Sequence, residues 1–331
     1  MEPVRRGPTT EAIPALSGTG ASIRRAVIDV GTNSVKLLVA DVAGREIRPV
    51  HEESKQTRLG KNFYDTHRLQ PEAIAKTAEA VWEYAEIARE RDAESIRVVA
   101  TSAARDAINQ EDLVTTVERA SGLKMEIISG EQEAEWAFQG VTLGSDLAKT
   151  PLLLLDVGGG STEFIVGHGK DKHFAESFKL GTVRMMEKIP HSDPPTAGEL
   201  AKSRDWLKTF LQKEVRPRLE PVLEREQQSG AVQLAGTGGS ATLLAKMELK
   251  LDRYDRDKIE AIRLPLKQIE LRRKQLWKLS LAQRKEIPGL PKNRADVILT
   301  GILIYEAVMD EFGFSELRVS TRGLRFAALM D

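Results

Sequence analysis

Short runs of apolar residues, each followed by a turn of small and polar residues, recur along the chain. The runs at residues 26–28 and 152–155 consist of Ala, Val, Ile and Leu and lead into an aspartate, a pattern typical of buried strands. Each turn leads into a second apolar run, at residues 35–39 and 164–166. The pattern therefore predicts two β-hairpins, one close to the start of the chain and one near its middle.

Between the hairpins, helical and strand patterns alternate. From Pro71 to Ala93, apolar residues recur every three or four positions, which predicts a helix with one buried face. The positions on that face are Ile74, Ala78, Val81, Ala85 and Ala88. Further elements are expected at residues 47–58 (strand and turn), 95–101 (strand), 110–120 (helix) and 124–128 (strand). This order predicts an α/β domain with a central sheet.

The part of the chain after the second hairpin is richer in helix. A strand is expected near residues 173–180, and Leu, Ile and Trp at helical spacing then predict helices at residues 197–223 and 266–281. Prolines 217, 221 and 265 are expected to interrupt them. The remaining elements expected are a helix at residues 294–312, a strand at 316–320 and an apolar stretch at 324–330.

The composition along the chain indicates two domains after a loose tail. Residues 1–22 mix Pro, Gly, Ser and Thr with two arginines, so we expect a tail outside the fold and no secretory signal. The Gly144-Ser145-Asp146 turn, followed by Pro151, marks a boundary. The predicted domains cover residues 23–145 and 146–312, and a chain of 331 residues gives each enough length for its own core.

Bulk composition excludes several classes of protein. The chain has no cysteine, which excludes disulfides and thiolate chemistry, and no apolar run long enough to cross a bilayer. Its 49 basic and 49 acidic residues give zero net charge, which does not favour a nucleic-acid-binding protein. We therefore expect a cytoplasmic protein. Basic residues cluster locally at residues 272–274, where a solvated helix face is expected, and at residues 284–285, 292–294 and 318–325.

The two hairpin turns carry nearly the same phrase, Asp-Val-Gly-Thr-Asn-Ser at residues 29–34 and Asp-Val-Gly-Gly-Gly-Ser at 156–161. A third Gly-rich turn, at residues 234–240, opens a helix-like segment. In such turns, backbone N–H groups can converge on an anion. One such turn is most often an ordinary hairpin turn, but three indicate a polyphosphorylated ligand. The candidate phosphate-binding residues are Gly31, Thr32, Asn33, Ser34, Gly158, Gly159, Gly160, Ser161, Thr162, Gly236, Thr237, Gly238, Gly239 and Ser240.

Carboxylates accompany these turns. Asp29 and Asp156 stand at strand ends and are hard oxygen ligands suited to Mg²⁺ or to its water shell; the alternative is that each only caps its turn. Farther along, Ser129 and Gln132 form the pattern of a capping box that starts a helix. Because helical residues turn by about 100° each, at most one of the three glutamates at positions 131, 133 and 135 can point inward.

The three turns resemble the phosphate-1, phosphate-2 and adenosine motifs of the actin, hexokinase and Hsp70 ATPase superfamily. Within it, the chain most resembles the exopolyphosphatase and guanosine pentaphosphate phosphohydrolase (Ppx/GppA) family over residues 25–329. The motifs lie in order at residues 26–38, 99–106, 127–134, 155–164, 234–240 and 294–298. The resemblance implies two actin-like (ribonuclease H-like) α/β domains flanking a ligand cleft, with residues 313–331 packed back on the first. It also implies a homodimer and a requirement for Mg²⁺. Whether a monovalent cation is also used stays open.

The resemblance also implies roles for single residues. Glu133 matches the glutamate that positions the attacking water, and Glu163 matches a second functional carboxylate that could bind Mg²⁺ or hold this water. Arg105 matches an arginine that faces the phosphate chain. The alternatives are a solvent-facing Glu163 and an Arg105 paired with a helix acid. Weaker candidates for lining the cleft are Arg58, Lys179 and Arg184.

Two features depart from the family pattern. Longer relatives carry a C-terminal helical domain of the His-Asp phosphohydrolase type, which we do not expect in this chain. Where many relatives have acidic residues near the end, this chain has Thr321-Arg322 and Phe326-Ala327. The change makes this turn more basic and more apolar.

The predicted function is a Mg²⁺-dependent hydrolase that releases terminal phosphate from inorganic polyphosphate, with Glu133 activating the water. The alternative substrate is guanosine pentaphosphate, because both substrates present a terminal phosphoanhydride to the same turns. Two further hypotheses stay open: a small-molecule kinase of the same superfamily, and a nucleotide or polyphosphate sensor that does not need Glu133. No membrane and no specific nucleic acid is expected as a partner.

Overall fold

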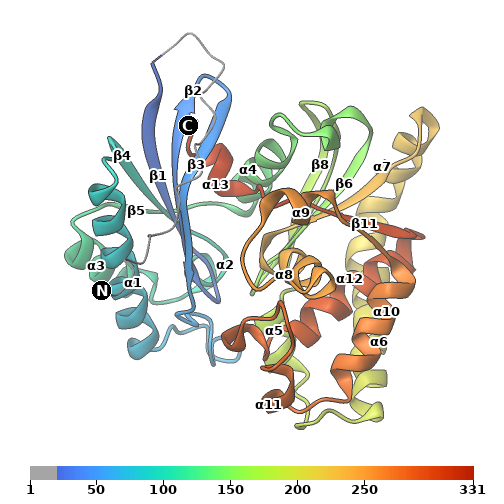
Figure 1. Cartoon of the computed structure of the whole chain (residues 1–331). Helices are drawn as coiled ribbons and strands as arrows, with labels where there is room; N and C mark the ends of the chain where they lie inside the picture. The colour runs from blue at the N-terminus through green and yellow to red at the C-terminus, as the bar shows by residue number, and fades with distance from the viewer. Residues whose placement is uncertain (1–20) are drawn as a thin grey trace, which may run out of the picture.

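The computed structural model describes residues 21–331, which form two lobes side by side (Figure 1). Each lobe is built on one β-sheet with helices packed against it. The tail expected at residues 1–22 lies, apart from its last two residues, outside the described residues. In the part of the chain that is described, no helix is long and apolar enough to cross a membrane.

The first lobe contains a five-stranded sheet in the order β3-β2-β1-β4-β5. Its strands are β1 (Ile23–Val30), β2 (Val35–Ala43), β3 (Glu46–Lys55), β4 (Ser95–Ala100) and β5 (Met125–Ile127). β1 and β2 form the first predicted hairpin, in which Asp29 pairs with Lys36, and β4 and β5 continue the sheet in parallel.

The second lobe repeats this arrangement. Its strands are β6 (Leu152–Val157), β7 (Thr162–His168), β8 (Asp171–Phe178), β9 (Gln233–Thr237), β10 (Arg263–Pro265) and β11 (Glu316–Val319). They are ordered β10-β11-β9-β6-β7-β8. From β8 to β11, two antiparallel pairs are followed by two parallel pairs, as in the first sheet from β3 to β5. The repeated turn phrase thus reflects a repeated fold unit, to which β10 adds an edge strand.

Helices cover both faces of the first sheet. On one face lie α1 (Pro71–Glu90) and α3 (Gln110–Ser121), which share a core with the strand residues Ala26 and Ile28. On the other face, α13 (Leu324–Ala328) packs beside Val27. The end of the described chain therefore packs on the first lobe, although β11, directly before it, belongs to the second.

Helix α4 (Gly130–Thr142) lies between the two sheets. Trp136 joins the core formed with α13 and the first sheet, whereas Phe138 packs against residues of β6 and β7. A Cβ on Gly140 would lie 2.2 Å from the backbone oxygen of Gly323, so glycine is needed where α4 meets the segment before α13. This packing fixes the first turn of α4 at the cleft between the lobes.

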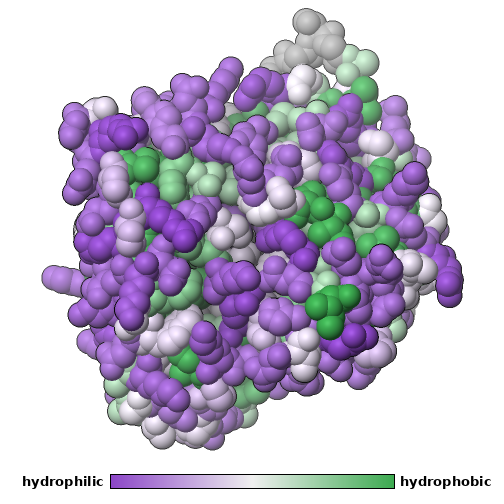
Figure 2. Space-filling view, turned by 180° about the vertical axis from the view of Figure 1, so that it is seen from behind, coloured by the Kyte–Doolittle hydropathy of each residue, from purple (hydrophilic) through white to green (hydrophobic). Residues whose placement is uncertain are grey.

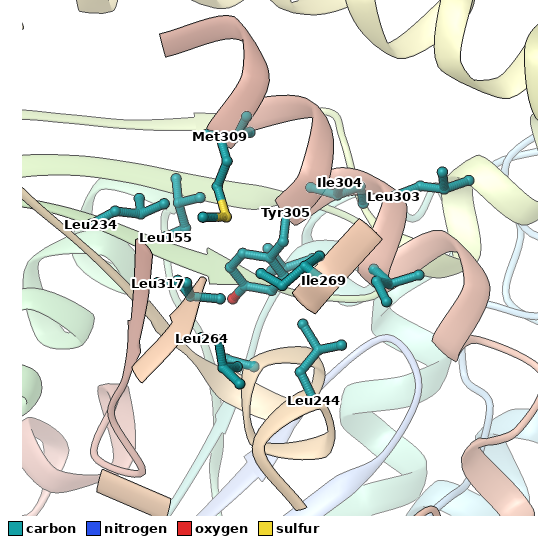
Figure 3. Packing of buried hydrophobic residues seen from close by; sticks show 14 of the residues in the cluster. Leu155, Leu234, Leu244, Leu264, Ile269, Leu303, Ile304, Tyr305, Met309 and Leu317 are labelled. Carbon is teal, nitrogen blue, oxygen red and sulfur yellow. The ribbon is translucent and has the colours of Figure 1, made fainter. Parts of the chain in front are cut away.

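The core of the second lobe surrounds α12 (Ile298–Phe312). Figure 3 shows Tyr305 of this helix among Leu155, Leu234 and Leu317 of the sheet. Its hydroxyl donates to the backbone oxygen of Thr237 at 3.3 Å. Burial of this apolar surface, at about 25 cal/mol per Å², is the main stabilising term for the lobe.

The prolines at 217 and 221 do not break the helix predicted at residues 197–223, so that expectation was wrong. Helix α6 (Ala197–Phe210) continues through a π-helical segment, Leu211–Val215, into α7 (Arg216–Ser229). The N–H of Arg216 donates to the oxygen of Leu211, five residues back, as in a π-helix. Pro217 therefore occupies the first turn of α7, where its missing N–H costs little.

The remaining elements are short helical segments and the two longer helices α8 and α10. They are α2 (Ser102–Asp106), η1 (Asp146–Lys149), α5 (Thr182–Lys188), α8 (Gly238–Leu249), α9 (Arg256–Ala261), α10 (Leu266–Trp277), α11 (Leu281–Arg284) and η3 (Lys292–Arg294). The face turned away from Figure 1 is mostly hydrophilic, with hydrophobic residues in small separate groups (Figure 2). The site described next lies between the lobes.

Candidate active site

The two matched turns meet in one pocket between the lobes. Gly31 donates its N–H to the oxygen of Ser34 at 3.1 Å, and Gly158 donates to that of Ser161 at 3.0 Å, so the two turns have the same internal hydrogen bond. The pocket is lined by Gly31, Thr32, Asn33, Ser34, Gly158, Gly159, Gly160 and Ser161, together with the four carboxylates of Asp29, Asp156, Glu133 and Glu163. Thr162 does not line it: its hydroxyl donates to the oxygen of Leu180 at 2.5 Å.

Glu133 projects into this pocket from the first turn of α4. Ser129 caps the helix by accepting the N–H of Gln132 at 3.1 Å, which is one of the two hydrogen bonds of the predicted capping box. Of the three glutamates in this turn, Glu131 is exposed and Glu135 pairs with Lys172, whereas Glu133 is 7% exposed. The helix therefore presents one carboxylate to the pocket.

Burial, opposed by Arg105 and aided by the nearby Asp156, raises the pKa of Glu133 to about 7. Nη1 of Arg105 lies 3.1 Å from Oε2 of Glu133 and donates to the oxygen of Ile128 at 2.9 Å. A carboxylate with a pKa near neutrality is suited to take a proton from water at physiological pH.

Glu163 lies on β7, opposite Ser177 of β8. It is 1% exposed and accepts a hydrogen bond from the Ser177 hydroxyl at 2.7 Å, so it does not face solvent. Burial, followed by the charges of Glu133 and Asp156, raises its pKa well above the usual range. The two glutamates thus titrate under each other's influence in one pocket.

The two aspartates fit a magnesium site in part. Asp29 is 3% exposed, and its Oδ1 has no hydrogen-bond partner among the described residues, while its Oδ2 lies 3.6 Å from Nζ of Lys36. Burial and the neighbouring Asp29 raise the pKa of Asp156, against the effect of Lys36. Within residues 21–331, no three acidic or histidine side chains lie close enough to enclose a metal ion. The donors suit Mg²⁺ that keeps several waters and is shared with a phosphate.

The third Gly-rich turn divides into two parts. Gly236 and Thr237 are buried in β9, where a Cβ on Gly236 would lie 2.7 Å from the Tyr305 hydroxyl. Gly239 and Ser240 line the phosphate pocket. Gly238 has a positive φ of 77°, and a Cβ there would lie 2.4 Å from Oδ1 of Asp156. The first two residues therefore belong to the packing behind the pocket.

The basic candidates lie around the pocket in different ways. Arg105 lies against Glu133 rather than among the residues that line the pocket. Arg58 pairs with Asp296 at 2.8 Å, and Lys179 is exposed. Arg184 holds the turn from behind, because its Nε donates to the oxygen of Gly160 at 2.7 Å.

The structure adds lining residues that the sequence reasoning did not single out. Lys36 lies beside Asp29 because the hairpin register pairs the two, so hairpin pairing was the available signal. Ser102, at the start of α2, had no signal beyond its place in a motif. Arg294 lines the pocket within a basic cluster noted in the sequence, and burial lowers the pKa of its guanidinium.

A second groove adjoins the phosphate pocket and shares Lys36, Gly239, Leu243 and Arg294 with it. The groove continues past Lys246, Tyr254 and Arg325 along the cleft. A substrate with its terminal phosphate in the pocket can therefore extend into a groove that offers both cationic and apolar contacts.

Comparisons with known proteins agree with this geometry. The model of the Ppx/GppA phosphatase family matches residues 38–331. Exopolyphosphatase 2 of Mycobacterium tuberculosis is 35% identical over 313 residues, which cover 91% of this chain and 95% of that protein. The guanosine-5'-triphosphate,3'-diphosphate pyrophosphatase of Photobacterium profundum is 28% identical over 301 residues, 91% of this chain and 57% of that protein.

Solved structures give the same result for the fold. A Ppx/GppA family member from Aquifex aeolicus aligns with a TM-score of 0.75 at 30% identity, over 94% of this chain and 97% of that one. An exopolyphosphatase from Cytophaga hutchinsonii aligns with a TM-score of 0.81 at 26% identity, over 92% and 96%. Together with the two sheets, these matches confirm the predicted fold class of two actin-like α/β domains.

Proposed function

The chain belongs to the Ppx/GppA phosphatase family, and from this premise we propose that it is a phosphoanhydride hydrolase that releases terminal phosphate from inorganic polyphosphate. The observation that carries the proposal is the buried Glu133, with a pKa of about 7, in the pocket where the two phosphate turns meet. A base matched to neutral pH beside two anion-binding turns is the arrangement that phosphoryl transfer to water requires.

In the proposed reaction, the turns at residues 31–34 and 158–161 hold the terminal phosphate through backbone N–H groups. The Glu133 carboxylate accepts a proton from a water molecule, whose oxygen attacks the terminal phosphorus. The bond from this phosphorus to the bridging oxygen breaks, and its electron pair stays on the shortened chain. The products are orthophosphate and a polyphosphate that is one unit shorter.

Asp29, Asp156 and Glu163 would hold Mg²⁺ largely through its water shell, which it would share with phosphate oxygens, because the three carboxylates do not enclose the ion directly. When bound, it would neutralise charge on the phosphate oxygens. In this proposal Lys36 stays close to Asp29 and the incoming phosphates, so that the buried carboxylates are not left without a counter-charge.

A second candidate substrate is guanosine pentaphosphate. The observation that favours it is the adjoining groove, where Leu243 and Tyr254 offer apolar contacts beyond the phosphates that a polyphosphate chain would not use. The relative from Photobacterium profundum is named for this kind of substrate. Both reactions break a terminal phosphoanhydride bond, so the same catalytic residues serve either.

The test is phosphate release by the purified protein from long-chain polyphosphate with Mg²⁺, beside guanosine pentaphosphate and ATP. The matched control is Glu133→Gln, which keeps the shape of the side chain and removes the base. We expect release from polyphosphate to fall by about 10²- to 10⁴-fold in the control. Ligand binding without turnover in the wild-type protein would favour a sensor, and phosphate transfer only to an added acceptor would favour a kinase.

A further inference from the structure

Three hydroxyl groups that the proposed mechanism does not use surround the second phosphate turn. They belong to Thr32, to Tyr64 in the segment after β3, and to Ser102. A Cβ on Gly160 would lie 2.4 Å from both the Ser102 and Tyr64 hydroxyl oxygens and 2.9 Å from that of Thr32. Only glycine at position 160 therefore lets these hydroxyls of the first lobe approach the turn of the second.

Two of these hydroxyls, those of Thr32 and Tyr64, lack a partner among the described residues. Oγ1 of Thr32 and Oη of Tyr64 are buried, and although they lie near each other, neither has a well-formed hydrogen bond to a described residue. Thr32 and Ser102 are 4% and 3% exposed, and both line the pocket that contains Glu133. A buried hydroxyl without a partner is unfavourable, so two of them next to the Ser102 hydroxyl indicate a place that a bound acceptor fills.

Tyr64 is held in place from the opposite lobe. The Arg184 guanidinium lies 4.1 Å from the centre of the Tyr64 ring, and the backbone N–H of Tyr64 donates to the Glu187 carboxylate at 3.2 Å. Burial raises the pKa of Tyr64, so that its hydroxyl stays protonated and can donate a hydrogen bond. The ring is thus fixed, and the hydroxyl is at the point where Thr32 and Ser102 meet Gly160.

We propose that Ser102 is a further substrate-binding residue. Its hydroxyl and the Thr32 hydroxyl donate to non-bridging oxygens of the terminal phosphate. Tyr64 is a positioning residue for both hydroxyls. The inference rests on the proposed function, because it concerns the phosphate that is transferred. A terminal phosphate has three non-bridging oxygens, whereas an internal phosphate has two. Additional donors at this point therefore select the end of the chain.

The chemistry of the donors suits turnover as well as binding. Hydroxyl groups are neutral donors, so each adds a hydrogen bond to a phosphate oxygen without the ion pair and bidentate geometry that a guanidinium would add. A pocket end made of hydroxyls can therefore orient the terminal phosphate without holding the orthophosphate product as tightly as arginines would. The Arg184 guanidinium, which lies over the Tyr64 ring, already donates to the backbone oxygen of Gly160 and to Asp106, the latter at 2.8 Å.

The test compares Ser102→Ala and Tyr64→Phe with the wild-type protein in binding of pyrophosphate with Mg²⁺, measured by calorimetry, and in KM and kcat for polyphosphate. We expect Ser102→Ala to weaken pyrophosphate binding by about 10-fold or more, because a hydrogen bond to a charged acceptor contributes about 1.5–3 kcal/mol. Tyr64→Phe should weaken it by roughly 3- to 10-fold. For Tyr64→Phe, the loss should be smaller when Ser102 is already Ala, since Tyr64 acts through Ser102 and Thr32.

Two controls remove hydroxyls elsewhere. Ser203→Ala, in α6, and Tyr84→Phe, in α1, change buried residues outside the pocket and should bind pyrophosphate as the wild type does. Pyrophosphate affinities of Ser102→Ala and Tyr64→Phe within twofold of the wild-type value would overturn the inference, as would a wild type that does not bind pyrophosphate. Binding that weakens as expected in a protein that hydrolyses no substrate would support the subsite and count against the proposed function alone.

Discussion

Nη1 of Arg105 lies 3.1 Å from Oε2 of Glu133. The same nitrogen donates to the oxygen of Ile128, so the guanidinium is anchored to the backbone next to the glutamate. Arg105 lowers the pKa of Glu133, yet burial and Asp156 keep it at about 7. The pair therefore sets the pH at which the proposed base is ionised.

Replacing Arg105 should move the pH dependence of activity. With Arg105→Met, Glu133 loses the neighbour that lowers its pKa, so the pKa should rise above 7 and the acid limb of the pH–kcat/KM profile should shift to higher pH. The loss of activity should be large at pH 6 and small at pH 9. Steady-state rates on polyphosphate over this range would measure the shift.

The same variant distinguishes the two roles considered for Arg105. If the guanidinium binds the phosphate chain, Arg105→Met raises KM by a similar factor at every pH and leaves the acid limb in place. Arg105→Lys is the matched control, because it keeps the charge near Glu133 but not the bond to Ile128. An unshifted acid limb in Arg105→Met would contradict the role in tuning the base.

Glu133 should make the folded protein less stable as pH rises. Its pKa is raised from 4.5 to about 7 on folding, so the stability that its protonated form gives is fully present below pH 4.5 and is lost as pH rises through 7. Without Mg²⁺ at pH 8, the free energy of unfolding in urea should therefore be higher for Glu133→Gln than for the wild type, by on the order of 3 kcal/mol. At pH 4.5 the two proteins should be about equally stable. The exposed neighbour Glu131→Gln should show no such difference, and an equal effect at both pH values would disprove the assignment.

Removal of one proposed metal ligand should raise the requirement for Mg²⁺. Oδ1 of Asp29 is buried and has no partner within residues 21–331, and Asp29→Asn keeps the size of the side chain while removing its charge. We expect the Mg²⁺ concentration for half-maximal activity to rise by about 10- to 100-fold, and the Mg²⁺-dependent increase in melting temperature to disappear. The exposed Asp112→Asn is the control. An unchanged thermal response to Mg²⁺ in Asp29→Asn would mean that the ion binds elsewhere.

Local patterns were sufficient to predict the hairpins and most helices. The 3.6-residue period of Ile74, Ala78 and Val81 and the Ser129 cap depend only on neighbouring residues, and both appear in the structure. The choice of Glu133 among three glutamates came from the resemblance. Its burial agrees with that choice, and its catalytic role stays a prediction.

The rest depends on contacts between distant residues. The sequence does not show that Tyr64 meets Gly160, because the two lie in different lobes. Nor does it show that Gly236 accommodates Tyr305 behind the phosphate pocket, because a glycine in a Gly-rich turn has the same local pattern in either role. The π-helical segment before Pro217 was missed because a proline in a helical pattern ordinarily predicts a break.

Removing one partner of a buried ion pair outside the phosphate pocket should strongly destabilise the second lobe. Arg273 and Glu306 are 4% and 1% exposed, and Nε of Arg273 donates to Oε2 of Glu306 at 2.6 Å. Arg273→Met leaves a buried carboxylate whose other cation, Arg204, is half exposed and 3.4 Å away. The free energy of unfolding in urea should fall by about 3–5 kcal/mol.

The double variant Arg273→Met with Glu306→Leu should recover most of this loss, because no buried charge is then left without its partner. As a control, Arg263→Met breaks an exposed pair with Glu316, at 3.1 Å, and should cost less than about 1 kcal/mol. If the double variant is as unstable as Arg273→Met alone, the cost lies in lost packing around the guanidinium. In that case the arginine stem, rather than the charge of Glu306, accounts for the stability of this core.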